Sequence, residues 1–95
     1  MDYRRLGGSG LQLSALSFGA WVTFGGSVRR NQARELIAQA FDHGVNFFDN
    51  AEVYAGGEAE RIMGDVLVDL RLPRDAFCVS SKVFWGAVEQ PRPTQ

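Results

Sequence analysis

The stretch that decides the fold is Phe47-Phe48-Asp49-Asn50-Ala51-Glu52-Val53-Tyr54, which runs from an apolar strand into polar residues. A second stretch of the same kind follows at Phe77-Cys78-Val79-Ser80-Ser81-Lys82. In parallel α/β proteins, ligand sites lie at the carboxyl ends of the strands. We therefore predict that Asp49, Tyr54 and Lys82 meet at one edge of a parallel sheet.

Lys82 is the only lysine among ten basic residues. Lysine is a compact point charge with an adjustable pKa, whereas arginine is a planar fork that stays protonated. A chain that uses arginine everywhere else is expected to need this lysine for a purpose that arginine does not serve. The alternative is a solvated strand end with no chemical role.

The regions around these two strands alternate between strand and helix patterns. A glycine-rich turn at 7–10 joins two short segments into a hairpin over 3–14, and residues 15–19 predict a buried strand. Apolar residues recur at helical spacing from 33 to 41, after Asn31 as N-cap and before Gly44. A second apolar stripe runs from 59 to 70 and ends before Pro73, while the tail over 86–95 shows no periodicity.

The resulting order is hairpin, β, α, β, α, β, which predicts an α/β fold with parallel strands joined by right-handed crossovers. Three strands do not close a barrel, and parallel sheets are normally covered on both faces. We therefore expect residues 1–95 to be one incomplete domain, with the βαβαβ unit reaching about residue 82. A complete (β/α)₈ barrel runs to about 250 residues.

Composition narrows the classes of function. The net charge of −1 comes from ten basic and eleven acidic residues in a mixed pattern, so we expect no nucleic-acid partner and no membrane insertion. The single Cys78 and the absence of a secretion signal indicate a cytoplasmic protein. His43 has no partners for a metal site. A nucleotide-binding Rossmann unit fits poorly, because the glycines precede no helix and Asp49 lies much further along than the expected ~20 residues.

Several segments together give the chain a specific resemblance. It resembles the N-terminal third of an aldo-keto reductase, a TIM barrel, and within that superfamily the branch of voltage-gated potassium channel β-subunits. The resemblance is carried, in correct order, by residues 3–7, 9–11, 21–26, 44–54 and 81–86. Residues 49–54 are the superfamily signature, and Trp21 to Gly26 with Phe84-Trp85-Gly86 point to the branch.

The resemblance implies a role for each matching residue. Tyr54 becomes the general acid of carbonyl reduction, Lys82 its charged neighbour, and Asp49 the partner of the lysine. The fourth member of the family's catalytic group, a histidine on the next strand, is not in this sequence. Ala20, Trp21, Ser27 and Asp49 correspond to positions near a nicotinamide coenzyme, with NADPH as the family's choice. Trp21 and Trp85 are expected to wall an apolar cleft for a small carbonyl substrate.

Three interpretations of function stay open at this stage. The first is an NADPH-dependent reductase of aldehydes or ketones, in which these 95 residues alone are inactive. The second is an auxiliary binding subunit of a potassium channel or another assembly that keeps the reductase fold. The third is a truncated product without activity. A homo-oligomer is compatible with each of them.

Overall fold

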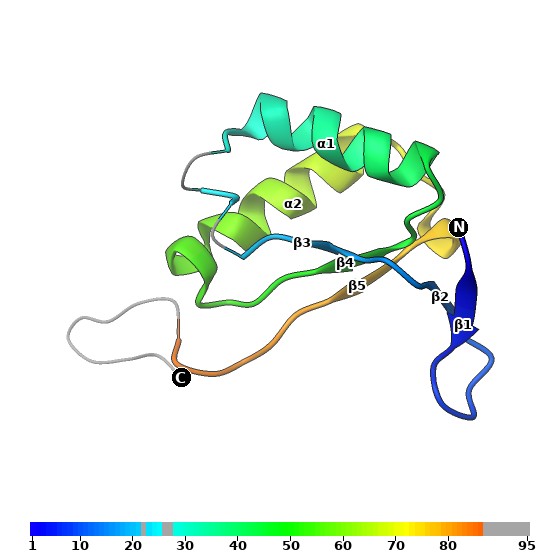
Figure 1. Ribbon diagram of the computed structural model, residues 1–95. Coiled ribbons are helices and arrows are strands. Elements are labelled where there is room, and N and C mark those ends of the chain that lie inside the picture. Colours follow the sequence, from blue (N-terminus) through cyan, green and yellow to red (C-terminus); the bar gives the residue numbers. More distant parts are fainter. Residues whose placement is uncertain (22, 26–27, 87–95) are drawn as a thin grey trace.

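The structure, a computed structural model, describes residues 1–21, 23–25 and 28–86 of the 95-residue chain. The expectations for Ser27 and for the tail beyond Gly86 lie outside these residues. The described chain forms a three-stranded parallel sheet with two helices on one of its faces, and a two-stranded hairpin at one end (Figure 1). The predicted order of hairpin, β, α, β, α, β is therefore confirmed.

The hairpin consists of β1 (Tyr3–Arg5) and β2 (Gln12–Ser14), which pair antiparallel. It lies at the end of the sheet where the parallel strands begin (Figure 1). Hydrogen bonds to Gly44 and Asn46 fix it there. The Tyr3 hydroxyl donates to the Gly44 carbonyl at 2.7 Å, and the Asn46 side-chain oxygen accepts from the Ser14 N–H at 2.8 Å. The hairpin thus leaves the opposite end of the sheet free.

The sheet contains β3 (Phe18–Gly19), β4 (Phe47–Asp49) and β5 (Cys78–Ser80) in that order, all parallel. Its register pairs Gly19 with Asp49 and Asp49 with Ser80. Paired residues in neighbouring strands project to the same face. Asp49 and Ser80 therefore face the same side, and the buried Phe48 faces the other.

The predicted buried strand over 15–19 is shorter than expected. Only Phe18 and Gly19 pair with β4, and Leu16 is 67% exposed. Leu16 precedes the first paired residue, and no described residue covers its side chain. An apolar run here marks the entry of the chain into the sheet rather than a buried strand.

Helices α1 (Arg30–Asp42) and α2 (Glu58–Asp69) connect the parallel strands. Short 3₁₀ turns precede α2 and β5, at η1 (Tyr54–Gly57) and η2 (Arg74–Ala76). The prediction of Asn31 as N-cap of α1 is wrong. The cap is Arg29, whose N–H donates to the Gln32 side chain at 3.3 Å, so Asn31 lies inside the first turn.

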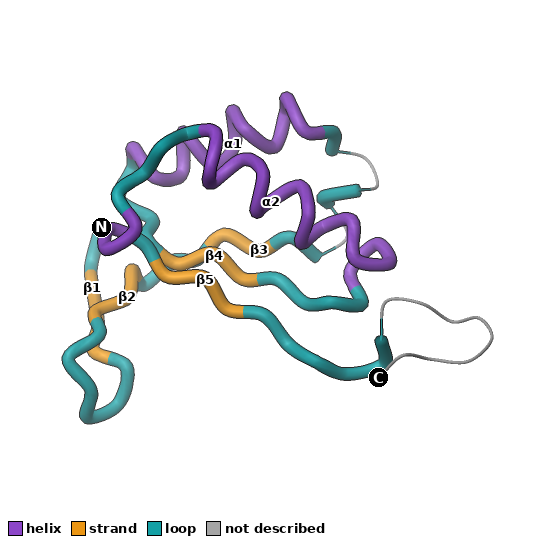
Figure 2. Tube along the Cα trace, turned by 180° about the vertical axis from the view of Figure 1, so that it is seen from behind, coloured by secondary structure: helices purple, strands orange, loops and turns teal. Residues whose placement is uncertain are grey.

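The core lies between the helices and the sheet. Phe48 and Ile37 have no exposed surface, and burying side chains of this size contributes roughly 1.5–3 kcal/mol each. Both helices lie on the same side of the strands (Figure 2). No described helix is long and apolar enough to cross a membrane. The buried apolar cluster consists of Ala20, Phe24, Ala33, Ile37, Phe48, Ala59, Ile62, Met63, Val66 and Leu67.

Candidate active site

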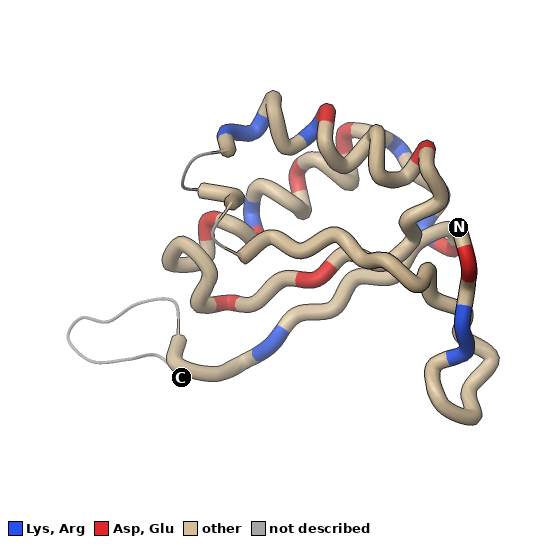
Figure 3. The backbone as a smooth tube through the Cα atoms, viewed as in Figure 1, with Lys and Arg blue, Asp and Glu red and all other residues tan. Residues whose placement is uncertain are grey.

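The three residues singled out in the sequence meet at the carboxyl ends of β4 and β5. The Lys82 ammonium lies 2.9 Å from both carboxylate oxygens of Asp49 and donates to the Asn50 carbonyl at 2.6 Å. It also lies 5.2 Å from the centre of the Tyr54 ring. Figure 3 shows acidic positions, in red, along the segment that contains β4 and a basic position, in blue, on the neighbouring segment that contains β5.

Backbone pairing beyond the strands brings these groups together. After β4 and β5 end, the Asn50 N–H donates to the Ser80 carbonyl at 2.9 Å and the Glu52 N–H to the Lys82 carbonyl at 3.1 Å. The two segments therefore continue side by side past the regular ladder. The predicted strand over 77–82 is shorter in the structure, where β5 ends at Ser80. Lys82 therefore lies two residues beyond the strand.

Asp49 is held in its ionised form. Its partial burial raises the pKa of the carboxyl group, but hydrogen bonds from Ser80 and Lys82 and the charge of Lys82 outweigh that effect. The pKa of Asp49 therefore lies below its ordinary value of 3.8. Its side chain is 32% exposed, so the carboxylate is still reached by water.

Lys82 is held in its charged form by the same contact. The hydrogen bond to Asp49 raises the pKa of Lys82 above its ordinary value, burial opposes this rise, and the Asp49 charge and the neighbouring Tyr54 add to it. The lysine side chain is 52% exposed. A raised pKa favours the charged ammonium and suits a fixed positive charge.

Tyr54 begins the turn that leads into α2. The turn requires left-handed backbone at Gly57, the N-cap of α2, where φ is 95°. Gly25 approaches this turn closely, since a Cβ at that position would lie 2.7 Å from the Ala55 Cβ. The Trp21 ring stacks on Tyr54 with 6.3 Å between ring centres. The Trp21 indole thus covers part of the Tyr54 ring, and the Tyr54 ring also lies beside the Lys82 ammonium.

The other predicted site residues are placed differently. Ala20 has no exposed surface and contributes a backbone N–H bonded to the Asp49 carbonyl at 3.0 Å, so it supports the site from within the core. Trp21 and Trp85 are each 67% exposed. The Trp85 ring packs edge-on against its neighbour Phe84, with 4.9 Å between ring centres. The structure therefore brings Trp21 to the tyrosine and leaves Trp85 packed against Phe84, while Ser27 lies outside the described residues.

Two groups at this site were not singled out from the sequence. The Ser80 hydroxyl donates to Asp49 Oδ1 at 2.5 Å. Its position two residues before Lys82 in the predicted strand over 77–82 was a usable signal, because alternate residues of a strand share a face. The second group is the Asn50 carbonyl, a backbone acceptor that carries no sequence signal. The Asn50 side chain is buried and donates to the Ala59 carbonyl at 3.1 Å, tying the end of β4 to α2.

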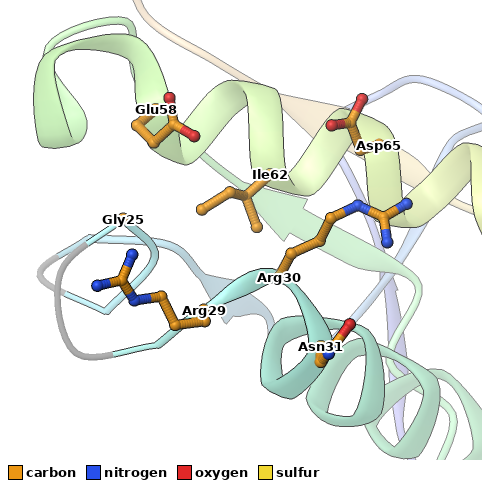
Figure 4. Close-up of a pocket in the computed structure, with 7 residues that line it drawn as sticks. All are labelled: Gly25, Arg29, Arg30, Asn31, Glu58, Ile62 and Asp65. Carbon is orange, nitrogen blue, oxygen red and sulfur yellow. The ribbon is translucent and has the colours of Figure 1, made fainter.

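A separate cleft of 360 Å³ lies between the starts of α1 and α2 (Figure 4). Arg29 and Arg30, the N-cap and first residue of α1, line it on one side, and Glu58 and Asp65 line it from α2. The Arg30 guanidinium extends along α2, where it lies 4.0 Å from the Asp69 carboxylate. Charges of both signs face this space, and no cluster of three or more metal-ligating side chains is present among the described residues. The cleft belongs to the helical layer, whereas Asp49 and Lys82 belong to the strand ends.

Comparison with known proteins shows the family to which this chain belongs. The sequence model of the aldo/keto reductase family matches residues 15–94. The chain belongs to the aldo/keto reductase family. The match includes Asp49, Tyr54 and Lys82, and begins just after the hairpin.

Curated plant proteins are similar to the chain over most of its length. It is 54% identical over 86 residues to the "Probable voltage-gated potassium channel subunit beta" of Arabidopsis thaliana, and 55% identical to the protein of the same name from Oryza sativa subsp. japonica. Each alignment covers 90% of this chain and 26% of the relative. The chain thus spans about a quarter of the length of the curated relatives it matches, and the resemblance to that branch is confirmed.

Solved reductases share the fold. A thermostable aldo-keto reductase crystallised with the inhibitor epalrestat superposes with a TM-score of 0.75 and 33% identity, over 87% of this chain and 31% of that protein. The holo form of an aldo-keto reductase from Bacillus halodurans gives a TM-score of 0.75 and 28% identity, over 90% of this chain and 27% of that protein. The predicted fold class, the N-terminal part of a TIM barrel, is therefore confirmed; the described strands form an open sheet.

Proposed function

We propose that the full-length barrel containing these 95 residues reduces aldehydes or ketones, with NADPH as coenzyme. The observation that carries the proposal is the placement of the Lys82 ammonium between the Asp49 carboxylate, 2.9 Å away, and the Tyr54 ring, 5.2 Å away. Membership of an oxidoreductase family supports the reaction class. The choice of NADPH over NADH and the inactivity of the 95-residue chain alone are parts of the proposal.

The coenzyme has a partial surface in this chain. The exposed Trp21 indole and the one-third exposed Asp49 carboxylate fit the nicotinamide end of such a molecule. Ala20 is buried and would support this surface rather than contact the coenzyme. When bound, NADPH supplies a hydride to the carbonyl carbon of the substrate. Trp21, and Trp85 in a closed barrel, would cover the substrate from water.

Tyr54 would supply the proton. As the carbon gains a hydride, the carbonyl oxygen gains negative charge, and the phenol donates its proton to that oxygen to form an alcohol. The positive charge of Lys82 favours this transfer because it stabilises the phenolate that remains. Asp49 holds the lysine charged and oriented through both carboxylate oxygens. Transfer of this kind is worth roughly 10²–10⁴-fold in rate.

Replacing the phenol tests the assignment. In the full-length barrel, Tyr54→Phe is expected to lower turnover of 4-nitrobenzaldehyde by about 10²-fold or more, because the proton donor is lost. Coenzyme affinity, measured by fluorescence titration, should stay within about twofold of the wild type, because the hydroxyl acts on the substrate oxygen.

The chain offers a matched control, because it has two tyrosines. Tyr3→Phe removes the hydroxyl that fixes the hairpin to Gly44, far from the strand ends. It should lower thermal stability and leave turnover unchanged. Wild-type turnover in Tyr54→Phe, with chemistry rate-limiting, would contradict the general-acid role.

A second function is favoured by the sequence identities. The relatives named as potassium channel subunits are 54% and 55% identical to the chain, against 33% and 28% for the solved reductases. On this hypothesis the barrel is an auxiliary subunit of a channel or another assembly. Affinity purification of the tagged full-length protein from its own cells, followed by mass spectrometry, separates the two. A stoichiometric membrane channel would support the second function, and a protein purified alone and active on carbonyls would support the first.

A further inference from the structure

Ser80 makes a close contact with the Asp49 carboxylate, and the proposed reaction gives this serine no role so far. Its hydroxyl donates to Asp49 Oδ1 at 2.5 Å, and the same oxygen accepts from Lys82 at 2.9 Å. The contact follows from the register, which pairs Asp49 with Ser80 across β4 and β5. Both side chains therefore project to the same face of the sheet, opposite the helices.

The other partner of the carboxylate is a long and half-exposed side chain. Lys82 lies two residues beyond β5, on a long side chain that is 52% exposed. Exposed lysine–carboxylate pairs hold their geometry weakly, because both side chains are flexible and water competes for them. Ser80 is part of the sheet itself, and its short side chain has one rotatable heavy-atom bond. It can hold the carboxylate in one orientation while the lysine closes onto it.

We infer that Ser80 is a positioning residue for carbonyl reduction: it fixes the Asp49 carboxylate so that this group aims Lys82 at Tyr54. This role rests on the proposed function. Ser80 does not touch the substrate in this scheme and acts through Asp49 alone. The hydroxyl also favours the ionised carboxylate, since a hydrogen bond donated to a charged acceptor stabilises the charged form.

The neighbouring serine provides a control of the same chemistry. The Ser81 hydroxyl bonds to the Glu60 carboxylate on α2, which is on the helical side of the strand. Ser81 follows the last residue of β5, and its hydroxyl does not bond to Asp49. Ser81→Ala therefore removes a serine hydroxyl next to Ser80 in the chain without touching the Asp49 carboxylate.

The first experiment isolates the hydroxyl in the 95-residue chain. The Asp49 carboxyl carbon is titrated by NMR in the wild type and in the Ser80→Thr, Ser80→Val and Ser81→Ala variants, with amide spectra recorded to show that each is folded. Threonine keeps the hydroxyl and valine has nearly the same shape without it. Lys82 is the titratable group that contacts this carboxylate, and Tyr54 in turn lies beside Lys82; both residues are the same in all four proteins.

The valine variant is expected to titrate at a higher pH than the wild type. The threonine variant and Ser81→Ala should titrate with the wild type. An Asp49 titration that is the same in Ser80→Val and Ser80→Thr would overturn the inference, and so would a shift in Ser81→Ala as large as that in Ser80→Val. Loss of folded amide spectra in Ser80→Val alone would also overturn it, because it would make the hydroxyl structural rather than positioning.

The second experiment measures the consequence for the reaction. In the full-length barrel, Ser80→Val is expected to lower kcat by about tenfold with little change in coenzyme affinity, because loose positioning of a catalytic group costs rate. Ser80→Thr should restore kcat, and Ser81→Ala should leave it unchanged. Equal kcat in the valine and threonine variants would overturn the positioning role. A wild-type barrel that reduces no carbonyl would refute the proposed function instead, and the NMR titration would still decide whether Ser80 fixes Asp49.

Discussion

Replacement of Lys82 by arginine keeps the positive charge but moves it, and so tests whether turnover depends on the exact position of that charge. The lysine ammonium donates to both Asp49 oxygens at 2.9 Å and to the Asn50 carbonyl at 2.6 Å, so three acceptor oxygens converge on one nitrogen. A guanidinium spreads its charge over a plane and prefers to bind a carboxylate side-on. It cannot occupy the same point between Asp49 and Asn50, and we expect its centre to move by about 1 Å relative to Tyr54.

The size of the effect can be worked from these distances. The charge lies 5.2 Å from the tyrosine ring centre. Moving it outward by about 1 Å weakens the Coulomb energy by only about 0.5 kcal/mol at an effective dielectric constant of about 20, which is two- to threefold in rate. Misplacement of catalytic groups by about 1 Å costs on the order of 10²-fold. The geometric effect therefore dominates, and we expect Lys82→Arg to lower turnover by about 10²-fold.

Turnover of 4-nitrobenzaldehyde and thermal unfolding of the full-length barrel test this expectation. Stability should change little, because an exposed ion pair is worth about 0–1 kcal/mol. Arg34→Lys makes the reverse exchange at an ion pair with Asp69, 2.7 Å across, and should leave turnover unchanged. If Lys82→Arg kept turnover within threefold of the wild type, the charge alone would matter and the argument from position would be refuted.

Two further predictions concern the chain by itself. The 95-residue chain should show no reduction of 4-nitrobenzaldehyde above that of its own Tyr54→Phe variant, because the family's histidine and most of the coenzyme surface are not in it; clear turnover above that control would contradict the proposal. Because the pKa of Asp49 is lowered by folding, its stabilisation is complete above the ordinary carboxyl pKa of 3.8 and is lost as the pH falls through the lower value of the folded state. Denaturant unfolding at a series of pH values should therefore show a weaker acid dependence in Asp49→Asn, and an unchanged dependence would argue against the ion pair.

The sequence predicted the elements whose patterns are long and regular. Both helices have an apolar stripe that buries residues such as Ile37 and Val66, and both lie where the spacing indicated. The strand before Asp49 was also predicted, because an apolar run between a helix-ending glycine and polar residues has few other interpretations. Burial against a partner layer enforces these patterns, so they are readable without the structure.

The predictions that were wrong or missing concern residues whose roles depend on contacts with another segment of the chain. Leu16 has the composition of a buried strand residue but precedes the first paired position, and pairing is a property of two segments rather than one. Asn31 has the better capping side chain, yet α1 begins two residues earlier, with Arg29 as N-cap, because the Gln32 side chain accepts from the Arg29 N–H. Ser80 was missed because a serine in a strand is common, and only the register shows that it faces Asp49.

The geometry and the strength of the Asp49–Lys82 ion pair have different origins. The contacts between Asp49 and Lys82 join β4 to the segment that follows β5, so the backbone pairing of these two segments is enough to bring the lysine to 2.9 Å from the carboxylate. Its strength depends on what covers it: the gross Coulomb attraction at this distance is about 1.4 kcal/mol in bulk water and about 6 kcal/mol at an effective dielectric constant of about 20. With Lys82 half exposed, the described chain lies toward the weak end of that range. We therefore expect a complete barrel to strengthen this group by excluding water from it, and to leave its distances almost unchanged.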